Sequence, residues 1–128
     1  MSVNPDDIVY TWKIHFFNCY PTLDNFQDVI FQIAADYIGT YNQITSNPDE
    51  GEPTIKEYKY SRFINASVNT DNISEFTPFD QITYDMTVSW ILSDPSVNIQ
   101  ELQSNLYEMI NNTVYPPPPT VVTLPPPF

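Results

Sequence analysis

Apolar side chains occupy every second position over long stretches of the first half of the chain, and this spacing constrains the fold more than any other feature. Successive side chains of a strand point to opposite faces of a sheet, so a period of two residues predicts strands that bury one face. Residues 8–20 form the first such stretch, and Pro21 is expected to end it. Trp12 and Ile14 should be buried. The whole expected inward face is Ile8, Tyr10, Trp12, Ile14 and Phe16.

Residues 29–41 and 55–68 show the same alternation and predict two further strands. The polar stretches 45–53 and 69–75 are expected to be loops. Three consecutive strands of this kind predict an antiparallel meander with one buried face. The expected inward residues are Val29, Phe31, Ile33, Ala35, Tyr37 and Tyr41 of the second strand, and Tyr58, Tyr60, Arg62, Ile64, Ala66 and Val68 of the third.

Residues 82–92 fit two structures. Their apolar side chains alternate as in a strand, but Thr83 is a suitable N-cap, and Asp94 followed by Pro95 is suited to ending a short helix. Residues 98–112 predict a helix, because their apolar residues recur at helical spacing and Asn98 can cap the start. We therefore expect an α+β fold, an antiparallel β-meander packed by one or two C-terminal helices, within a compact domain of residues 1–114.

Residues 115–128 have a different composition from the rest of the chain. Seven of the thirteen prolines lie here, and the segment carries no charged residue. A disordered proline-rich tail is one interpretation. The apolar residues favour the other, an extended arm that docks on a partner, because proline lowers the entropy lost on binding. The expected contact residues are Pro116, Pro117, Pro118, Pro119, Val121, Val122, Leu124, Pro125, Pro126, Pro127 and Phe128.

The net charge of −12 limits the classes of partner. Phosphate backbones and anionic membranes attract basic proteins, so we expect neither nucleic acid nor a membrane as partner. The acidic surface suits solubility or a basic protein patch. The start of the chain has neither basic residues nor an apolar run, so no secretion signal is expected.

Few residues of the sequence are suited to catalysis. His15 and Cys19, each alone of its kind, lie four residues apart on an expected strand, about 13 Å between their Cα atoms, too far for a nucleophile and its base. The acidic stretch 47–52 lacks the closing Glu of an EF-hand loop. Paired-carboxylate chemistry would need burial of residues such as Asp6, Asp7, Asp71 and Glu75. We expect no enzyme, no cofactor and no small-molecule substrate.

Several short motifs bear a resemblance to a known family. They are residues 10–14 (YTWKI), Tyr20-Pro21, residues 76–79 (FTPF), and Ile82-Thr83 leading to residues 89–91 (SWI), with a Val/Leu/Pro-rich end closed by an aromatic residue. Together they resemble a family of small uncharacterised proteins of tailed bacteriophages, especially marine and cyanobacterial ones. The resemblance implies a phage context and favours a helix over residues 84–92.

Two hypotheses for function follow from these features. The first is a virion accessory protein, a capsid decoration or a neck or tail component, that stabilises the particle through its domain surface and its C-terminal arm. Its partners would be other virion structural proteins or copies of itself, and it would be made in the host cytoplasm. The alternative is a small intracellular phage protein that binds and modulates a host protein.

Overall fold

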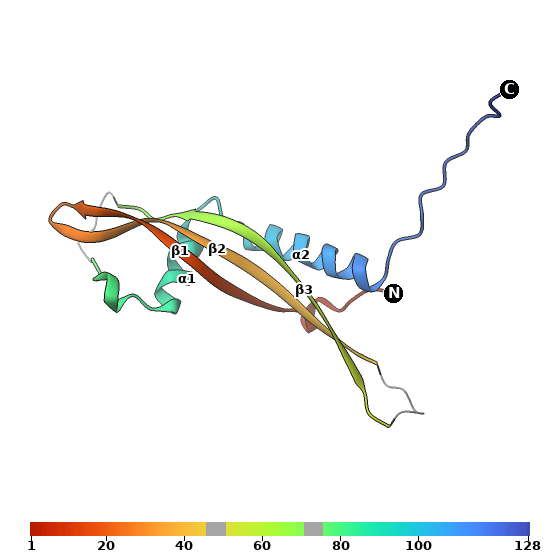
Figure 1. Ribbon diagram of the computed structural model, residues 1–128, viewed down its shortest axis with the longest axis horizontal. Coiled ribbons are helices and arrows are strands. Elements are labelled where there is room, and N and C mark those ends of the chain that lie inside the picture. The colour runs from red at the N-terminus through yellow and green to blue at the C-terminus, as the bar shows by residue number, and fades with distance from the viewer. Residues whose placement is uncertain (46–50, 71–75) are drawn as a thin grey trace.

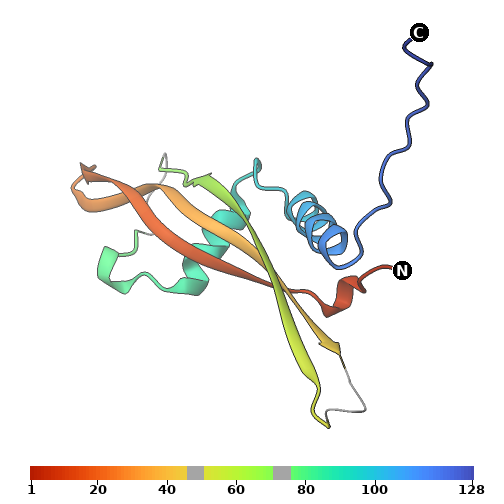
Figure 2. The same ribbon diagram turned by 45° about the vertical axis from the view of Figure 1, so that its right-hand side comes forward.

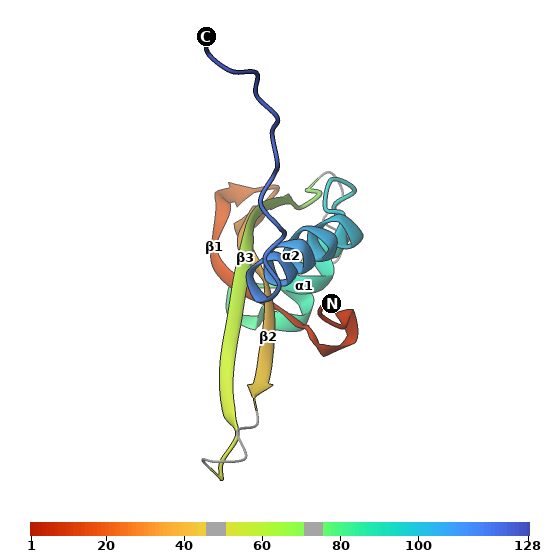
Figure 3. The same ribbon diagram turned by 90° about the vertical axis from the view of Figure 1, so that its right-hand side faces the viewer.

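The computed structural model describes residues 1–45, 51–70 and 76–128. Three long strands form one antiparallel sheet in the order β1-β2-β3. Both helices pack on the same face of this sheet (Figures 1 and 3), which confirms the predicted α+β meander with C-terminal helices. The elements are the 3-10 turn η1 (Pro5–Asp7), strands β1 (Val9–Leu23), β2 (Phe26–Thr45) and β3 (Thr54–Ser67), the 3-10 turn η2 (Phe79–Gln81), and helices α1 (Tyr84–Ser93) and α2 (Ile99–Val114).

A tight hairpin joins β1 to β2 and makes both strands longer than predicted. Leu23 pairs with Phe26, and the two residues between them, Asp24 and Asn25, have φ values of 50° and 71°. Positive φ at both central residues matches the right-handed twist of the strands. The prediction that Pro21 ends the strand was wrong, because β1 is an edge strand, where a missing N–H costs no ladder hydrogen bond.

The β1–β2 pairing has two irregularities, and the first one reverses the alternation of β1. The register shifts between Ile14 and Phe16 and again between Asn18 and Cys19. An extra residue in one strand turns every later side chain to the other face. Phe16 was predicted to face inward but is 53% exposed, and Phe17 packs against the core in its place.

The second irregularity changes the inward face of β2. Cys19 pairs with Ile30, while Asn18 pairs with Gln32, so Phe31 has no partner in the register. Ile30 is therefore the core residue, and the predicted inward residue Phe31 stacks on exposed Tyr20, with 4.4 Å between ring centroids. On β3 the alternation holds for Ile64 and Ala66, which pack in the core with Val68 just beyond the strand. Arg62, also predicted to face inward, is exposed.

Trp12 and Ile14 face the core as predicted, but they are half-buried rather than buried. They lie on an edge strand, so only one side of each has a neighbouring strand. The Trp12 ring lies 4.5 Å from that of Tyr37. The Tyr84 hydroxyl of α1 bonds with both the backbone N–H and the carbonyl of Trp12, each at 3.3 Å, and so joins the helix to the edge of the sheet.

Capping residues decide where the helices begin. The Thr83 hydroxyl accepts a hydrogen bond from the Met86 N–H at 3.2 Å, which confirms the helical alternative for residues 84–92. Asn98 caps α2 in the same way, accepting from the Glu101 N–H at 3.1 Å. Helix α2 lies close to β2 at Gly39, where an added Cβ would lie 3.3 Å from the Tyr10 ring and 3.4 Å from Leu106.

Candidate functional site

The C-terminal arm, residues 116–128, extends away from the domain in every view (Figures 1, 2 and 3). All of its residues are exposed, and it forms neither helix nor strand. Proline runs lack N–H donors and prefer an extended backbone, which explains this conformation. The predicted contact residues Val121, Val122, Leu124 and Phe128 are among the most exposed apolar residues of the chain.

The base of the arm is held firmly by the domain. Val114 and Tyr115 pack against a core cluster that includes Val3, Ile8 and Ile110. Directly before them, the Thr113 hydroxyl lies 2.6 Å from the hydroxyl of Tyr60 on β3. The arm therefore leaves a fixed point of the fold, and Pro116 is its first exposed residue.

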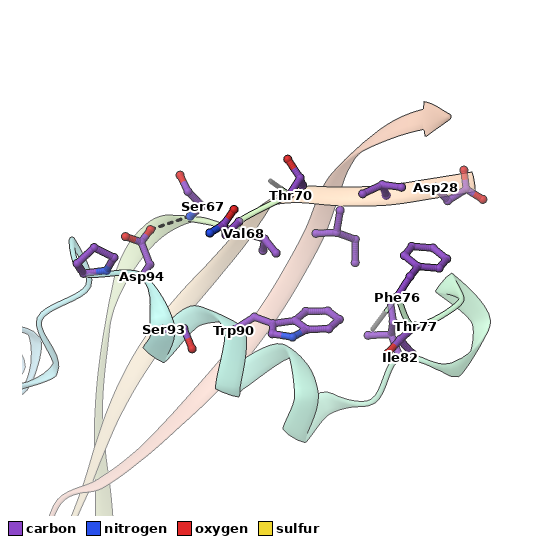
Figure 4. Close-up of a pocket in the computed structure, with 14 residues that line it drawn as sticks. Asp28, Ser67, Val68, Thr70, Phe76, Thr77, Ile82, Trp90, Ser93 and Asp94 are labelled. Carbon is purple, nitrogen blue, oxygen red and sulfur yellow. Dashed lines mark hydrogen bonds between the residues drawn. The ribbon is translucent and has the colours of Figure 1, made fainter. Parts of the chain in front are cut away.

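A groove opens at the other end of the domain, and we call it the Trp90 groove (Figure 4). Trp90 projects into it from α1, and Phe76 and Ile82 form the wall beside it. Its volume of about 700 Å³ falls in the range of small-ligand and peptide pockets. The remaining lining comes from the start of β2, from the ends of β3 and α1 with the residues that follow them, and from the segment before η2: Asp28, Val29, Ile30, Ser67, Val68, Asn69, Thr70, Thr77, Ser93, Asp94 and Pro95.

Aromatic contacts hold one wall of this groove in place. The Phe76 ring lies 4.6 Å from that of Phe26 at the start of β2. Phe79 of η2 meets Phe17 of β1 edge-on at 5.8 Å. The floor residues Val29 and Ile30 are buried, whereas Trp90 and Phe76 are half-buried and remain accessible. The groove thus presents two aromatic rings and an apolar floor, with polar residues around them, on a rigid support.

Asp94 holds the end of the groove where α1 meets β3. Its carboxylate accepts hydrogen bonds from the Ser67 N–H at 2.7 Å and from the N–H and hydroxyl of Ser96 at 2.9 and 2.8 Å. The bonds from the Ser67 and Ser96 N–H groups are the largest reason that the pKa of Asp94 lies below its ordinary value. Burial acts in the opposite direction but does not outweigh them.

The face of the sheet opposite the helices carries a second apolar surface. Phe16 and Tyr20 of β1 and Phe63 of β3 are exposed there. His15 lies among them, with its Nε2 atom 2.9 Å from Asp36 Oδ2 and its ring 6.0 Å from that of Phe63. This outer aromatic face, made of Phe16, Tyr20 and Phe63, gives the domain surface a contact area separate from the arm.

The residues weighed for catalysis are not brought together. His15 lies on the outer face, whereas Cys19 packs into the core on the helix side. Burial first, and the Asp28 carboxylate second, raise the pKa of the Cys19 thiol. Asp6 and Asp7 are exposed in η1, and Asp71, Glu75 and residues 47–50 lie outside the described residues. Within the described ranges, no three His, Cys, Asp or Glu side chains gather as metal ligands do.

A family model with the description "Domain of unknown function (DUF7936)" matches residues 7–125. The match spans the sheet, both helices and the arm as far as Pro125. No curated protein and no solved structure matches the chain. None of the helices in the described ranges has the length and apolar character that crossing a membrane requires.

Proposed function

Since the chain belongs to this family, whose model extends well into the arm, we propose that the arm is a functional part of the domain and docks on a structural protein. In this proposal the protein is an accessory component of a phage particle, as capsid decoration or at the neck or tail. It stabilises the particle by packing the arm, and the outer aromatic face, against the principal structural protein. The phage setting comes from the sequence motifs described above.

The observation that carries the proposal is the chemistry of the exposed arm. Val121 and Leu124 are 89% and 78% exposed, and Phe128 is fully exposed, in a segment without a charged side chain. A solvating tail is rich in polar and charged residues, which this segment is not. Burying one such side chain contributes about 1.5–3 kcal/mol, and the proline runs reduce the ordering cost of binding.

Quantitative mass spectrometry of purified particles tests the proposal. The wild-type protein should be present in many copies, and a chain that ends at Tyr115 should be absent or strongly depleted. A matched control replaces Thr120 by Ser, which keeps the length and composition of the arm. Wild-type occupancy of the truncated chain would show that the arm is not the docking element. Absence of the wild-type protein from particles would contradict the virion role and leave the alternative, binding to a host protein.

A further inference from the structure

We propose that the Trp90 groove is the receptor for the arm of a second copy of this chain, with Pro125–Phe128 of one protomer lying against Trp90 and Phe76 of the next. This inference rests on the proposed docking role of the arm and names its partner. Both halves of the contact are present in one sequence, at opposite ends of the molecule (Figures 1 and 4).

The groove has the chemistry that recognises proline-rich segments. Extended proline-rich peptides bind grooves lined with aromatic side chains, because the flat rings pack on the proline rings and the preformed backbone loses little entropy. Trp90 and Phe76 supply the rings, and Ile30 and Ile82 supply the apolar floor and side. Prolines offer only carbonyl acceptors, and the indole N–H of Trp90 has no hydrogen-bond partner among the described residues.

The end of the arm fits this surface. Three consecutive prolines precede Phe128, so the segment combines a preformed extended backbone with one large apolar side chain. Phe128 is fully exposed and contacts nothing in its own domain. Its burial in the groove would remove an aromatic side chain from water on each side of the contact.

Geometry favours a second copy over the chain's own groove. The arm starts at the C-terminal end of α2, whose sixteen residues span about 24 Å, and α1 with the groove lies beyond the other end of that helix. From its start the arm runs away from α1, the helix that carries Trp90 (Figure 1). Thirteen extended residues reach about 40 Å, enough to meet the groove of a neighbouring protomer.

Charge also favours contact through the arm alone. Two domains of this net charge, −12 for the chain, repel one another when their surfaces meet. At physiological salt this repulsion is screened within about 8 Å, much less than the reach of the arm. An uncharged arm can therefore join two acidic domains while it keeps them apart. A contact of arm to groove is heterologous, so it builds rings or open chains of protomers.

Sedimentation of the purified full-length protein over a wide concentration range tests the inference. We expect concentration-dependent association in the wild type, and Phe128→Asp should weaken it by about tenfold or more, because the aromatic ring is lost and a negative charge replaces it in a groove that Asp28 and Asp94 also line. The matched control Thr120→Asp adds the same charge to the arm outside the docked segment and should associate like the wild type. The arm contributes nothing to the domain core, so neither variant affects folding.

Tryptophan fluorescence locates the contact. In a Trp12→Phe background, which leaves Trp90 as the sole tryptophan, a peptide of residues 116–128 added to the chain ending at Tyr115 should shift the emission to shorter wavelength and saturate. No shift, together with a monomer at every concentration, would overturn the inference. The emission of the full chain can also be compared with that of the chain ending at Tyr115. If the full chain emits at shorter wavelength at every protein concentration, the arm occupies its own groove and the inference is overturned. If the purified protein stays monomeric while the truncated chain fails to enter particles, only this inference fails and the proposed function stands.

Discussion

At the scale of single residues, Asp94 joins parts of the chain that are distant in sequence. Asp94 is the C-cap residue of α1, and its carboxylate orders the turn at Ser96 and accepts the N–H of Ser67 at the end of β3. Only 8% of Asp94 is exposed, so these three hydrogen bonds must meet its need for solvation. The residue thereby fixes the helix that carries Trp90 against the strand that forms the far side of the groove.

Replacing Asp94 by Asn should lower the free energy of unfolding by about 1–3 kcal/mol at neutral pH, because hydrogen bonds to a charged acceptor are lost. The pKa of Asp94 is lowered in the folded state, so its stabilising contribution is complete above the ordinary value of about 3.9. It disappears as the pH falls through the lowered value. Urea unfolding of both proteins should therefore show a difference that is constant near neutral pH and narrows in acid.

Glu108→Gln, an exposed change on α2, is the matched control for Asp94→Asn and should change the free energy of unfolding at neutral pH by no more than about 0.5 kcal/mol. Equal stability of Asp94→Asn and the wild type at neutral pH would mean that the Ser67 and Ser96 hydrogen bonds contribute nothing.

At the scale of elements, α1 is a short helix that its cap and one tyrosine hold in place. Alternation over residues 82–92 is compatible with a strand, and ten residues form a marginal helix in water. The Thr83 cap satisfies the Met86 N–H, and Tyr84 ties the first turn to Trp12. Ile91 is fully buried and fixes the helix on the sheet. Its neighbour Trp90 stays accessible in the groove.

Thr83→Ala should destabilise the protein by about 1 kcal/mol, because it leaves the Met86 N–H without its cap. Thr83→Ser keeps the hydroxyl and should cost little. Thermal unfolding followed by circular dichroism measures both changes. If alanine and serine were equally tolerated, the hydroxyl would not be what starts the helix.

At the scale of the whole molecule, the core is complete before the arm begins. The last packed residues are Val114 and Tyr115, which close the cluster around Ile110. The arm itself lies fully in solvent in the isolated protomer. The domain should therefore lose the arm without a change in its own stability.

Two truncations test this boundary. A chain that ends at Tyr115 should unfold at the same urea concentration as the full-length protein, because only exposed residues are removed. A chain that ends at Thr113 should lose about 1–3 kcal/mol, because Val114 and Tyr115 leave the core cluster. A large loss of stability for the Tyr115 truncation would show that the arm also packs on its own domain.

Much of the fold follows from local patterns in the sequence. Alternation depends only on neighbours two residues apart, and it predicts the three strands and the antiparallel sheet. Helix caps depend on contacts three residues apart, so Asn98 and Thr83 mark both helix starts. The proline content and lack of charge of residues 116–128 likewise identify the arm from sequence alone.

The tertiary structure alone decided where the strand faces reverse and where the groove lies. A bulge at His15 depends on the partner strand, so local alternation cannot show that Phe17 replaces Phe16 in the core. Pro21 continues a strand because β1 lies at the edge, which is a property of the topology. The Trp90 groove combines segments separated by tens of residues, and Asp94 bonds with Ser67 across 27 positions. Such contacts exist only once the chain has folded, because no local periodicity records which distant segments will meet.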